Sequence, residues 1–319
     1  MKEKLLVSVS PHIQSRLTTP IIMMEVILAL LPAVCASIYF FGWQAVKVIM
    51  STVSATLLTE IIFQKLRKMP VSIKDNSALL TGILLALCLP PGLPVWLSFF
   101  GGATAIILGK QIYGGLGYNL FNPALVGRAV LNIAWPAQMS TWVIPRSNWK
   151  AAIEGITGAT PLAIAKGLTE TAQKLPDYGA LFWGNISGSL GETSTFCLLL
   201  GGLYLLLRRQ ISWRIPGCFL GTVVIMSLVF PGHGSALFNL LSGGLMLGAI
   251  FMATDYVTSP ITPRGKIFFG IGCGLVTSLI RFWGSFPEGV AFAILFMNAL
   301  TPLIERYTQP RLFGKGKYA

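Results

Sequence analysis

A threonine preceded by small residues is the most chemically suggestive feature of the sequence. Thr160 ends the stretch Glu154-Gly155-Ile156-Thr157-Gly158-Ala159-Thr160 and is followed by Pro161. Because Gly158 and Ala159 have almost no side chain, we expect the Thr160 hydroxyl to be exposed to a modifying enzyme. Such a hydroxyl can form a phosphodiester and tether a phosphorylated cofactor. The alternative is a helix start, with Thr160 as N-cap and Pro161 at the first helical position.

Asp255 is a candidate site for a small cation. It follows a run without charge, 215–254, and hydroxyl residues flank it: Thr254, Thr258 and Ser259. Hydroxyl, carbonyl and carboxylate oxygens are the ligands that a small hard cation prefers. The alternative is a carboxylate at the end of a span that pairs with Arg264 or Lys266.

Five further ionisable residues lie in or near apolar segments: Glu25, Glu60, Arg128, Arg281 and Glu288. Such groups are costly in hydrocarbon and are functional candidates by default. The plainer expectations are that Glu25 and Glu60 extend to a nearby membrane interface, and that Glu288 pairs with Arg281 at an outer span end.

The composition indicates that the segments carrying these residues lie in a membrane. Apolar residues make up 54% of the 319 residues and charged residues only 11%, against about a quarter in soluble domains. The uncharged stretches 26–46, 76–109 and 215–254 are each long enough for one or two bilayer crossings of about 20 residues. Soluble, fibrous, disordered and secreted disulfide-rich classes are excluded. The five cysteines include no Cys-x-x-Cys pair, so neither a zinc site nor a thiol redox motif is indicated.

The basic residues predict the topology. We expect ten membrane spans, near 21–41, 44–64, 77–90, 94–109, 118–134, 194–207, 215–231, 236–253, 267–283 and 288–304. With a cytoplasmic N-terminus, six of the 24 Lys and Arg residues fall outside: Lys47, Arg146, Lys150, Lys166, Lys174 and Arg281. The other 18, Arg128 among them, fall inside, as the positive-inside rule expects. Both termini are therefore predicted to be cytoplasmic and Thr160 to lie on the outer side. The net charge of +13 is thus a topology signal, and a nucleic-acid partner is not indicated.

The predicted fold is an all-α polytopic membrane protein of two inverted five-helix halves, with some helices short or broken. Leu80–Ala86 resembles Leu241–Leu247, and Leu120–Leu125 resembles Leu295–Leu300, although chance similarity between such apolar segments is the alternative. Inverted repeats place a binding site near the middle of the bilayer. The expected parts are a cytoplasmic lead, a first membrane half, an external loop, a second membrane half and a cytoplasmic tail: 1–20, 21–134, 135–192, 193–305 and 306–319.

Several stretches together resemble one family. Residues 154–160 are similar to the acidic-x-x-Ser/Thr-Gly-Ala-Thr signature of the NqrB/RnfD membrane flavoproteins, with Glu154 where Asp is usual and Thr157 where Ser is common. Similar stretches are Gly109–Ala124, Met252–Asp255 with Thr258–Pro260, and Glu288–Leu295. The likeness covers about residues 15–305, and the short chain favours the RnfD branch.

The resemblance implies covalent FMN, attached through its phosphate to Thr160 by a flavin transferase. Thr157, Gly158 and Ala159 belong to the same motif, and Thr157 is the second choice of acceptor. The resemblance also implies a second, non-covalent flavin (riboflavin). Asn119 and Asn122 follow a glycine-rich break, where their amides could hydrogen-bond a flavin or hold the kinked backbone.

The implied role is that of one subunit of a ferredoxin:NAD oxidoreductase in a bacterial or archaeal cytoplasmic membrane. Its partners would be other Rnf subunits, in the membrane or bearing flavin or iron–sulfur clusters, and the complex would translocate Na+ or H+, with Asp255 as a candidate ion site. No catalytic side chain is indicated, because the chemistry belongs to the flavin ring. The alternatives are an NqrB-like subunit of a Na+-translocating quinone reductase, or a flavin-free channel or transporter for a small solute.

Overall fold

The computed structural model describes residues 17–145, 157–167, 176–192, 194–284, 286 and 288–310. A first group of helices precedes the long connecting segment. Its members are α1 (Thr19–Phe41), α2 (Trp43–Leu66), the 3-10 turn η1 (Ile73–Asp75), α3 (Ser77–Leu87), α4 (Val95–Ile106), the π-helical turn η2 (Ile107–Gln111) and α5 (Pro123–Ala134).

The connecting segment contains short elements only, and a second group of helices follows it. The short elements are α6 (Pro136–Met139), β1 (Trp142–Val143), β2 (Thr157–Gly158), α7 (Pro161–Ala165) and α8 (Tyr178–Trp183). The second group comprises α9 (Thr195–Leu207), α10 (Arg214–Val229), η3 (Pro231–His233), α11 (Ala236–Leu241), α12 (Leu245–Leu247), the π-helical turn η4 (Gly248–Met252), α13 (Pro263–Trp283) and α14 (Val290–Thr308). Each expected span overlaps a helix or consecutive short helices, with boundaries that differ by up to several residues.

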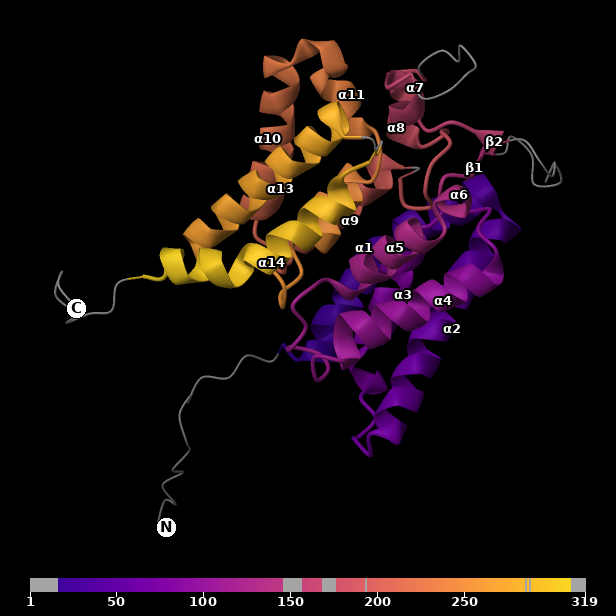
Figure 1. The fold of residues 1–319 in the computed structure, drawn as a ribbon, viewed down its shortest axis with the longest axis vertical. Helices are drawn as coiled ribbons and strands as arrows, with labels where there is room; N and C mark the ends of the chain where they lie inside the picture. Colours follow the sequence, from indigo (N-terminus) through magenta and orange to yellow (C-terminus); the bar gives the residue numbers. More distant parts are fainter. Residues whose placement is uncertain are drawn as a thin grey trace, which may run out of the picture.

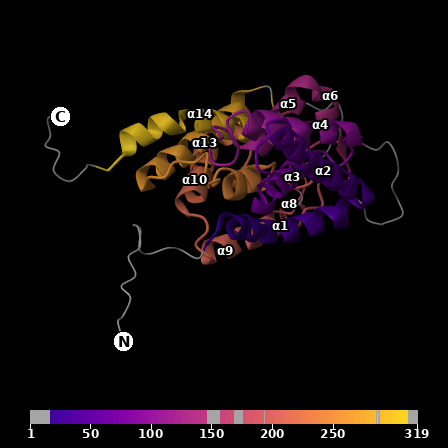
Figure 2. The same cartoon turned by 90° about the horizontal axis from the view of Figure 1, so that it is seen from below.

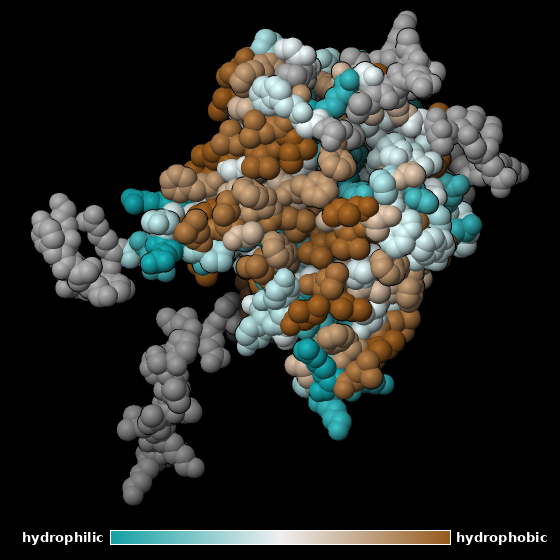
Figure 3. Space-filling view, in the orientation of Figure 1, coloured by the Kyte–Doolittle hydropathy of each residue, from teal (hydrophilic) through white to brown (hydrophobic). Residues whose placement is uncertain are grey.

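Long apolar helices confirm a multi-pass helical membrane protein. Among the described residues, α1, α2, α13 and α14 are long and apolar enough to cross a bilayer, and α3, α5, α9 and α10 are shorter apolar helices. On the face that Figure 3 shows, hydrophobic side chains cover a large part of the helices, and the most hydrophilic ones lie mainly toward the edges. This distribution is what a surrounding bilayer requires.

The two groups of helices lie side by side (Figures 1 and 2). They meet where α1 packs against α9 and where α5 packs against α14. The first of these contacts depends on glycine, because a Cβ on Gly201 of α9 would lie 2.1 Å from the backbone oxygen of Ala29 in α1. One continuous apolar core extends through both groups.

The molecule has two opposite ends. The connecting segment lies at one of them, and the first helix starts and the last helix stops at the other (Figure 1). The start of α1 and the end of α14 lie at one end, called here the inner end. β1, β2, α7 and α8 lie at the other, called the outer end (Figure 1). The buried residues Leu162, Leu181, Ile186, Phe238 and Leu241 form a small second core at the outer end.

Several helices are interrupted where the sequence provides glycine or proline. α5 begins at Pro123, later than expected, because the Asn122 side chain caps it by accepting from the Ala124 N–H at 3.1 Å. Between α11 and α12 the chain breaks at Ser242-Gly243-Gly244, with Gly243 at a φ of 67°. The segment Leu241–Leu247 therefore crosses a break, whereas its expected counterpart Leu80–Ala86 lies within one helix.

Candidate functional site

Thr160 forms the N-cap of α7. Its Oγ1 accepts a hydrogen bond from the Ala163 N–H at 3.2 Å, and Pro161 occupies the first helical position. The side chain is only 2% exposed. The prediction of an exposed hydroxyl is therefore wrong for this conformation, because α7 folds back and packs Leu162 into the small outer core.

The preceding motif residues form a strand and a turn. Thr157 and Gly158 of β2 pair antiparallel with Val143 and Trp142 of β1. A Cβ on Gly158 would lie 2.4 Å from Ser187 Oγ, so the motif glycine is required for packing. Ala159 is half-buried. The motif's Glu154, and with it residues 155 and 156, lies outside the described residues.

Lys166 ties α7 to the outer end of α13. Its Nζ donates to the backbone oxygens of Ile280, Gly284 and Phe286, at 3.2, 2.9 and 2.7 Å. Burial and the nearby Arg281 guanidinium lower the pKa of Lys166. The motif is thus held against the second group of helices.

Near α7 lies a group of four charged residues, buried Arg128, Glu192 and Arg281 and partly buried Glu288, called here the outer charge cluster. Arg128 of α5 forms an ion pair with Glu288, and its Nη2 lies 3.7 Å from Glu192 Oε1. Arg128 is therefore part of a buried network near the outer end, and counting it among the inner loop charges was wrong.

Arg281 has a different partner from the one expected. Its Nη1 donates to the backbone oxygen of Asn239 at 2.7 Å, and its Nη2 to that of Ser242 at 3.1 Å. These carbonyls belong to the C-terminal end of α11, where intrahelical partners are missing. The predicted Glu288–Arg281 pair is thus wrong: Glu288 pairs with Arg128, and Arg281 caps the broken helix.

A cavity of about 300 Å³ opens beside this cluster. Arg128, Glu288, Asn132 and Ser140 supply its polar lining, and Trp142, Phe286 and Phe292 supply aromatic surface. Because Trp142 pairs with Gly158 in the motif, this outer cavity adjoins the segment that carries Thr160. Apolar walls with a few polar groups are typical of small-molecule sites.

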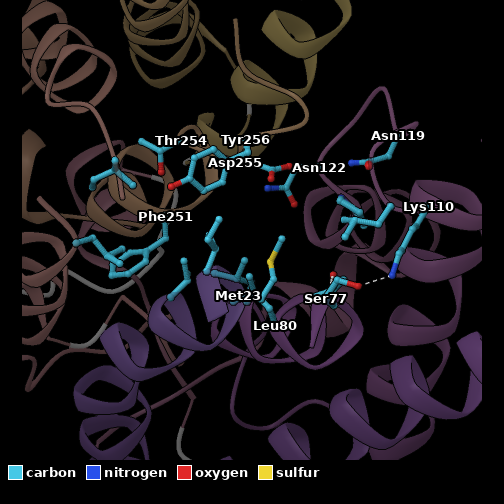
Figure 4. Close-up of a pocket in the computed structure, with 18 residues that line it drawn as sticks. Met23, Ser77, Leu80, Lys110, Asn119, Asn122, Phe251, Thr254, Asp255 and Tyr256 are labelled. Carbon is cyan, nitrogen blue, oxygen red and sulfur yellow. Dashed lines mark hydrogen bonds between the residues drawn. The ribbon is translucent and has the colours of Figure 1, made fainter. Parts of the chain in front are cut away.

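A second pocket lies between the two groups of helices and holds about 60 Å³. Figure 4 shows Met23, Ser77 and Leu80 on one side of it and Thr254, Asp255 and Tyr256 on the other, with Lys110 and Asn119 at one end. Both groups of helices contribute to the wall. This inner pocket is where the structure brings together Asn119, Asn122 and Asp255.

The two asparagines are engaged with the backbone. Asn119 accepts from the Gly117 N–H and donates to the Phe121 oxygen, both at 3.3 Å. Asn122 caps α5 and donates to the Met252 oxygen at 3.3 Å, which links the two groups of helices. Their observed contacts therefore fit the alternative in which they hold the kinked backbone.

At the inner end, Glu60, Lys110, Gln64, Ser72, Ser77 and Gln111 form an inner charge cluster. Lys110 Nζ donates to Glu60 Oε1 at 2.7 Å and to Ser77 Oγ at 2.6 Å. Three other side chains also donate to Glu60 Oε1, and they are Gln64, Ser72 and Gln111. Glu60 is fully buried, so the prediction that it extends to the interface is wrong.

Glu25 is also buried and bonded. It accepts from Arg208 and from Gln210 Nε2, and the Tyr256 hydroxyl donates to Gln210. These hydrogen bonds connect Glu25 of α1, through Gln210, to Tyr256, which lines the inner pocket. The expectation that Glu25 extends to the interface is therefore wrong as well.

One of the hydroxyl residues that flank Asp255 in the sequence forms a hydrogen bond with it. Thr258 Oγ1 donates to Asp255 Oδ2 at 3.1 Å. Among the described residues, no ion pair joins Asp255 to Arg264 or Lys266, and no group of three or more His, Cys, Asp or Glu residues is placed to hold a metal ion.

Comparison with known proteins identifies the family. Residues 6–314 match the profile of the NQR2, RnfD, RnfE family. The chain belongs to this family. The recognition made from the flavinylation signature and its accompanying stretches is confirmed.

Similar proteins share nearly the whole chain. The D subunit of the proton-translocating ferredoxin:NAD(+) oxidoreductase complex of Clostridium ljungdahlii is 45% identical over 97% of this chain and 96% of its own length. The D subunit of the Na(+)-translocating ferredoxin:NAD(+) oxidoreductase complex of Acetobacterium woodii is 45% identical over 98% and 96%. The D subunit of the ion-translocating oxidoreductase complex of Stutzerimonas stutzeri is 45% identical over 92% of each chain.

Sequence reasoning missed Glu192 as a member of the outer charge cluster. Its neighbours in sequence, Gly191 and Thr193, suggest an ordinary loop. The signal available was its position directly before an apolar segment, where an acidic residue faces the same cost as Glu25 or Glu60.

Proposed function

We propose that this chain is the D-type membrane subunit of an Rnf-type ferredoxin:NAD oxidoreductase, which passes electrons through covalent FMN and couples them to Na+ or H+ translocation. The match to D subunits over nearly the full length of both chains carries this proposal. The chain is not a complete enzyme, because its sequence has no dinucleotide fingerprint or iron–sulfur cysteine pattern. Other subunits must supply those groups.

The proposed topology has ten crossings in two inverted five-span halves. The order of neighbours supports it: α2 packs on α3 and α4, and α4 on α5, while α10 packs on α11 and α13, and α13 on α14. The first spans of the two halves meet each other, and so do the last. In this topology both termini are cytoplasmic and Thr160 faces outward, as the distribution of basic residues favours.

Thr160 is the proposed site of covalent FMN. An esterified Thr160 oxygen can still accept a hydrogen bond from the Ala163 N–H. The N-cap contact is therefore compatible with a phosphoester bond to FMN. The low exposure of the side chain means that 157–167 must open, or be modified before it packs, for the transferase to reach it. When bound, the flavin supplies one-electron transfer, and the outer cavity beside Trp142 offers aromatic surface close to the attachment segment.

The inner pocket is the proposed site of the second flavin, riboflavin. Its walls combine apolar side chains with Ser77, Lys110, Asp255 and Tyr256. Its 60 Å³ are well below the roughly 300 Å³ of typical ligand pockets, so a flavin must displace flexible side chains such as Met23. Chromatography of the flavin released from the denatured complex tests this proposal, since one riboflavin per chain is expected and none would overturn it.

The covalent linkage is tested by replacing the acceptor in the complete complex. Thr160→Ala should abolish the flavin fluorescence of this subunit in a denaturing gel. Thr157→Ala is the matched control, because it removes the neighbouring hydroxyl of the same motif and should keep the fluorescence. Fluorescence that survives Thr160→Ala and disappears in Thr157→Ala would move the linkage to Thr157.

The same preparation separates the alternative functions. A colourless, non-fluorescent wild-type subunit would favour a flavin-free transporter. Quinone reduction by the intact complex, in place of NAD reduction with ferredoxin, would favour a quinone-reductase subunit.

A further inference from the structure

Glu192 is the member of the outer charge cluster with the weakest partners. Its side chain is 4% exposed. Among the described residues, Oε2 accepts from the Ser189 N–H alone, at 3.4 Å, and buried Oε1 has no hydrogen-bond partner, although Arg128 Nη2 lies 3.7 Å away. A Cβ on Gly244 would lie 3.3 Å from this oxygen, so Oε1 points to the break between α11 and α12.

Within the ranges that the structure describes, neither nearby arginine donates a hydrogen bond to Glu192. Arg128 is paired with Glu288. Arg281 donates to the carbonyls at the C-terminal end of α11, where a helix carries roughly half a negative charge. In the described part of the chain, Glu192 therefore has only the longer, 3.7 Å ion pair, with a guanidinium that Glu288 holds more closely. A buried carboxylate in that position is strongly disfavoured, and binding a proton removes the cost.

The contacts around Glu192 reach the outer cavity on one side and the inner pocket on the other. On one side, its contact Arg128 lines the outer cavity together with Glu288. On the other side, the backbone N–H of Gly191 donates to the Leu87 oxygen at 2.6 Å, at the end of α3. One turn earlier in α3, Leu84 lines the inner pocket. Glu192 thus lies between the outer cavity and the inner pocket.

We propose that Glu192 is a reversible proton-binding site that exchanges its proton with water in the outer cavity. Binding breaks one O–H bond of a hydronium ion in the cavity, which leaves as water, and forms one O–H bond on the Glu192 carboxylate, whose charge changes from −1 to 0. The Arg128–Glu288 pair stays intact and no electron is transferred. A proton fits this site better than a metal cation. Buried Arg128 Nε and Arg281 Nε have no hydrogen-bond acceptor, so they compete with a cation for the nearby oxygens.

The proposal concerns only the protonation of Glu192 and goes beyond the flavin assignments. A carbodiimide test reads it directly, because dicyclohexylcarbodiimide reacts with protonated carboxyl groups in apolar surroundings. The complete complex in native membranes is treated at a series of pH values, and the labelled peptides are identified by mass spectrometry. We expect Glu192 to be labelled and Glu60 and Glu288, whose ion pairs are shorter, to stay unlabelled. Above the midpoint, each pH unit should lower labelling about tenfold.

Two variants sharpen the test. Glu288→Gln frees the Arg128 guanidinium to pair with Glu192, so labelling of Glu192 should fall severalfold at the same pH. Glu192→Gln should remove that label without creating one on Glu288. The wild-type pH series needs no variant, so a variant that fails to assemble leaves the proposal testable.

Three results would overturn the proposal. They are labelling of Glu288 in place of Glu192, absence of the Glu192 label at every pH, and protection of Glu192 by Na+ but not by K+ at constant pH. The last result would make the site a sodium site. None of these results bears on flavin fluorescence, so failure here is distinguishable from failure of the covalent FMN assignment.

Discussion

The inner and outer charge clusters solve the same problem in different ways. Both place titratable side chains within an apolar chain. In the inner cluster, four donors converge on Glu60 Oε1, and all of them come from residues 64–111. In the outer cluster, Arg128 belongs to the first group of helices, Arg281 and Glu288 to the second, and Glu192 to the segment between them.

The difference lies in how completely the polar atoms are satisfied. Only one side-chain atom of the inner cluster, Glu60 Oε2, is buried without a partner, whereas each of the four outer residues has one such atom. A nearly saturated network within one group of helices acts as a rigid clamp, since any change leaves a buried charge. An unsaturated network between two groups has room for water and for a change of protonation. The outer cluster is therefore the better candidate for a part that changes during turnover.

The largest expected effect comes from breaking the inner cluster. Glu60→Gln leaves the Lys110 ammonium buried without a counter-charge, which costs roughly 3–5 kcal/mol. The thermal unfolding midpoint of the purified complex should fall markedly. The double variant Glu60→Gln with Lys110→Met removes both charges and should recover most of the loss. An unchanged midpoint in the single variant would mean that the inner cluster is not a clamp.

Much of the fold could be predicted from the sequence, because it depends on local patterns. Apolar runs located the helices, Pro161 and Thr160 predicted a helix start, and the motif identified the family. The partners of the buried charges could not be predicted. Arg128 and Glu288 are 160 positions apart and Arg208 and Glu25 are 183 apart, so their pairing depends on how the two groups of helices pack.

The candidate site shows the same limit. The exposure of Thr160 was inferred from its small neighbours, but burial is decided by α8 and α11, whose Leu181 and Phe238 pack in the same small core as Leu162. For Asn119 and Asn122, the sequence favours the backbone role only slightly over flavin binding. Only the positions of distant backbone groups, such as the Met252 oxygen, distinguish the two roles.

An intermediate effect is expected where the outer cluster supports the broken helix. Arg281→Met preserves the length of the side chain but leaves the carbonyls of Asn239 and Ser242 without this donor. Losing buried hydrogen bonds to the guanidinium costs about 1–3 kcal/mol, so the unfolding midpoint should fall less than in Glu60→Gln. Arg281→Lys is the control, because it keeps one of the two hydrogen bonds and should lie between wild type and Arg281→Met. A loss as large as that of Glu60→Gln would show that Arg281 also carries the counter-charge of Glu192.

The smallest effect is expected from Glu192→Gln, the outer counterpart of Glu60→Gln. If Glu192 holds its proton, the substitution exchanges one neutral side chain for another of nearly equal shape. The amide oxygen can still accept from the Ser189 N–H, so the change in stability should be about 1 kcal/mol or less. Measured side by side at neutral pH, the two Glu→Gln variants should differ severalfold in their shift of the unfolding midpoint. Equal shifts would mean that Glu192 is as fully ionised and paired as Glu60, and that both clusters are clamps.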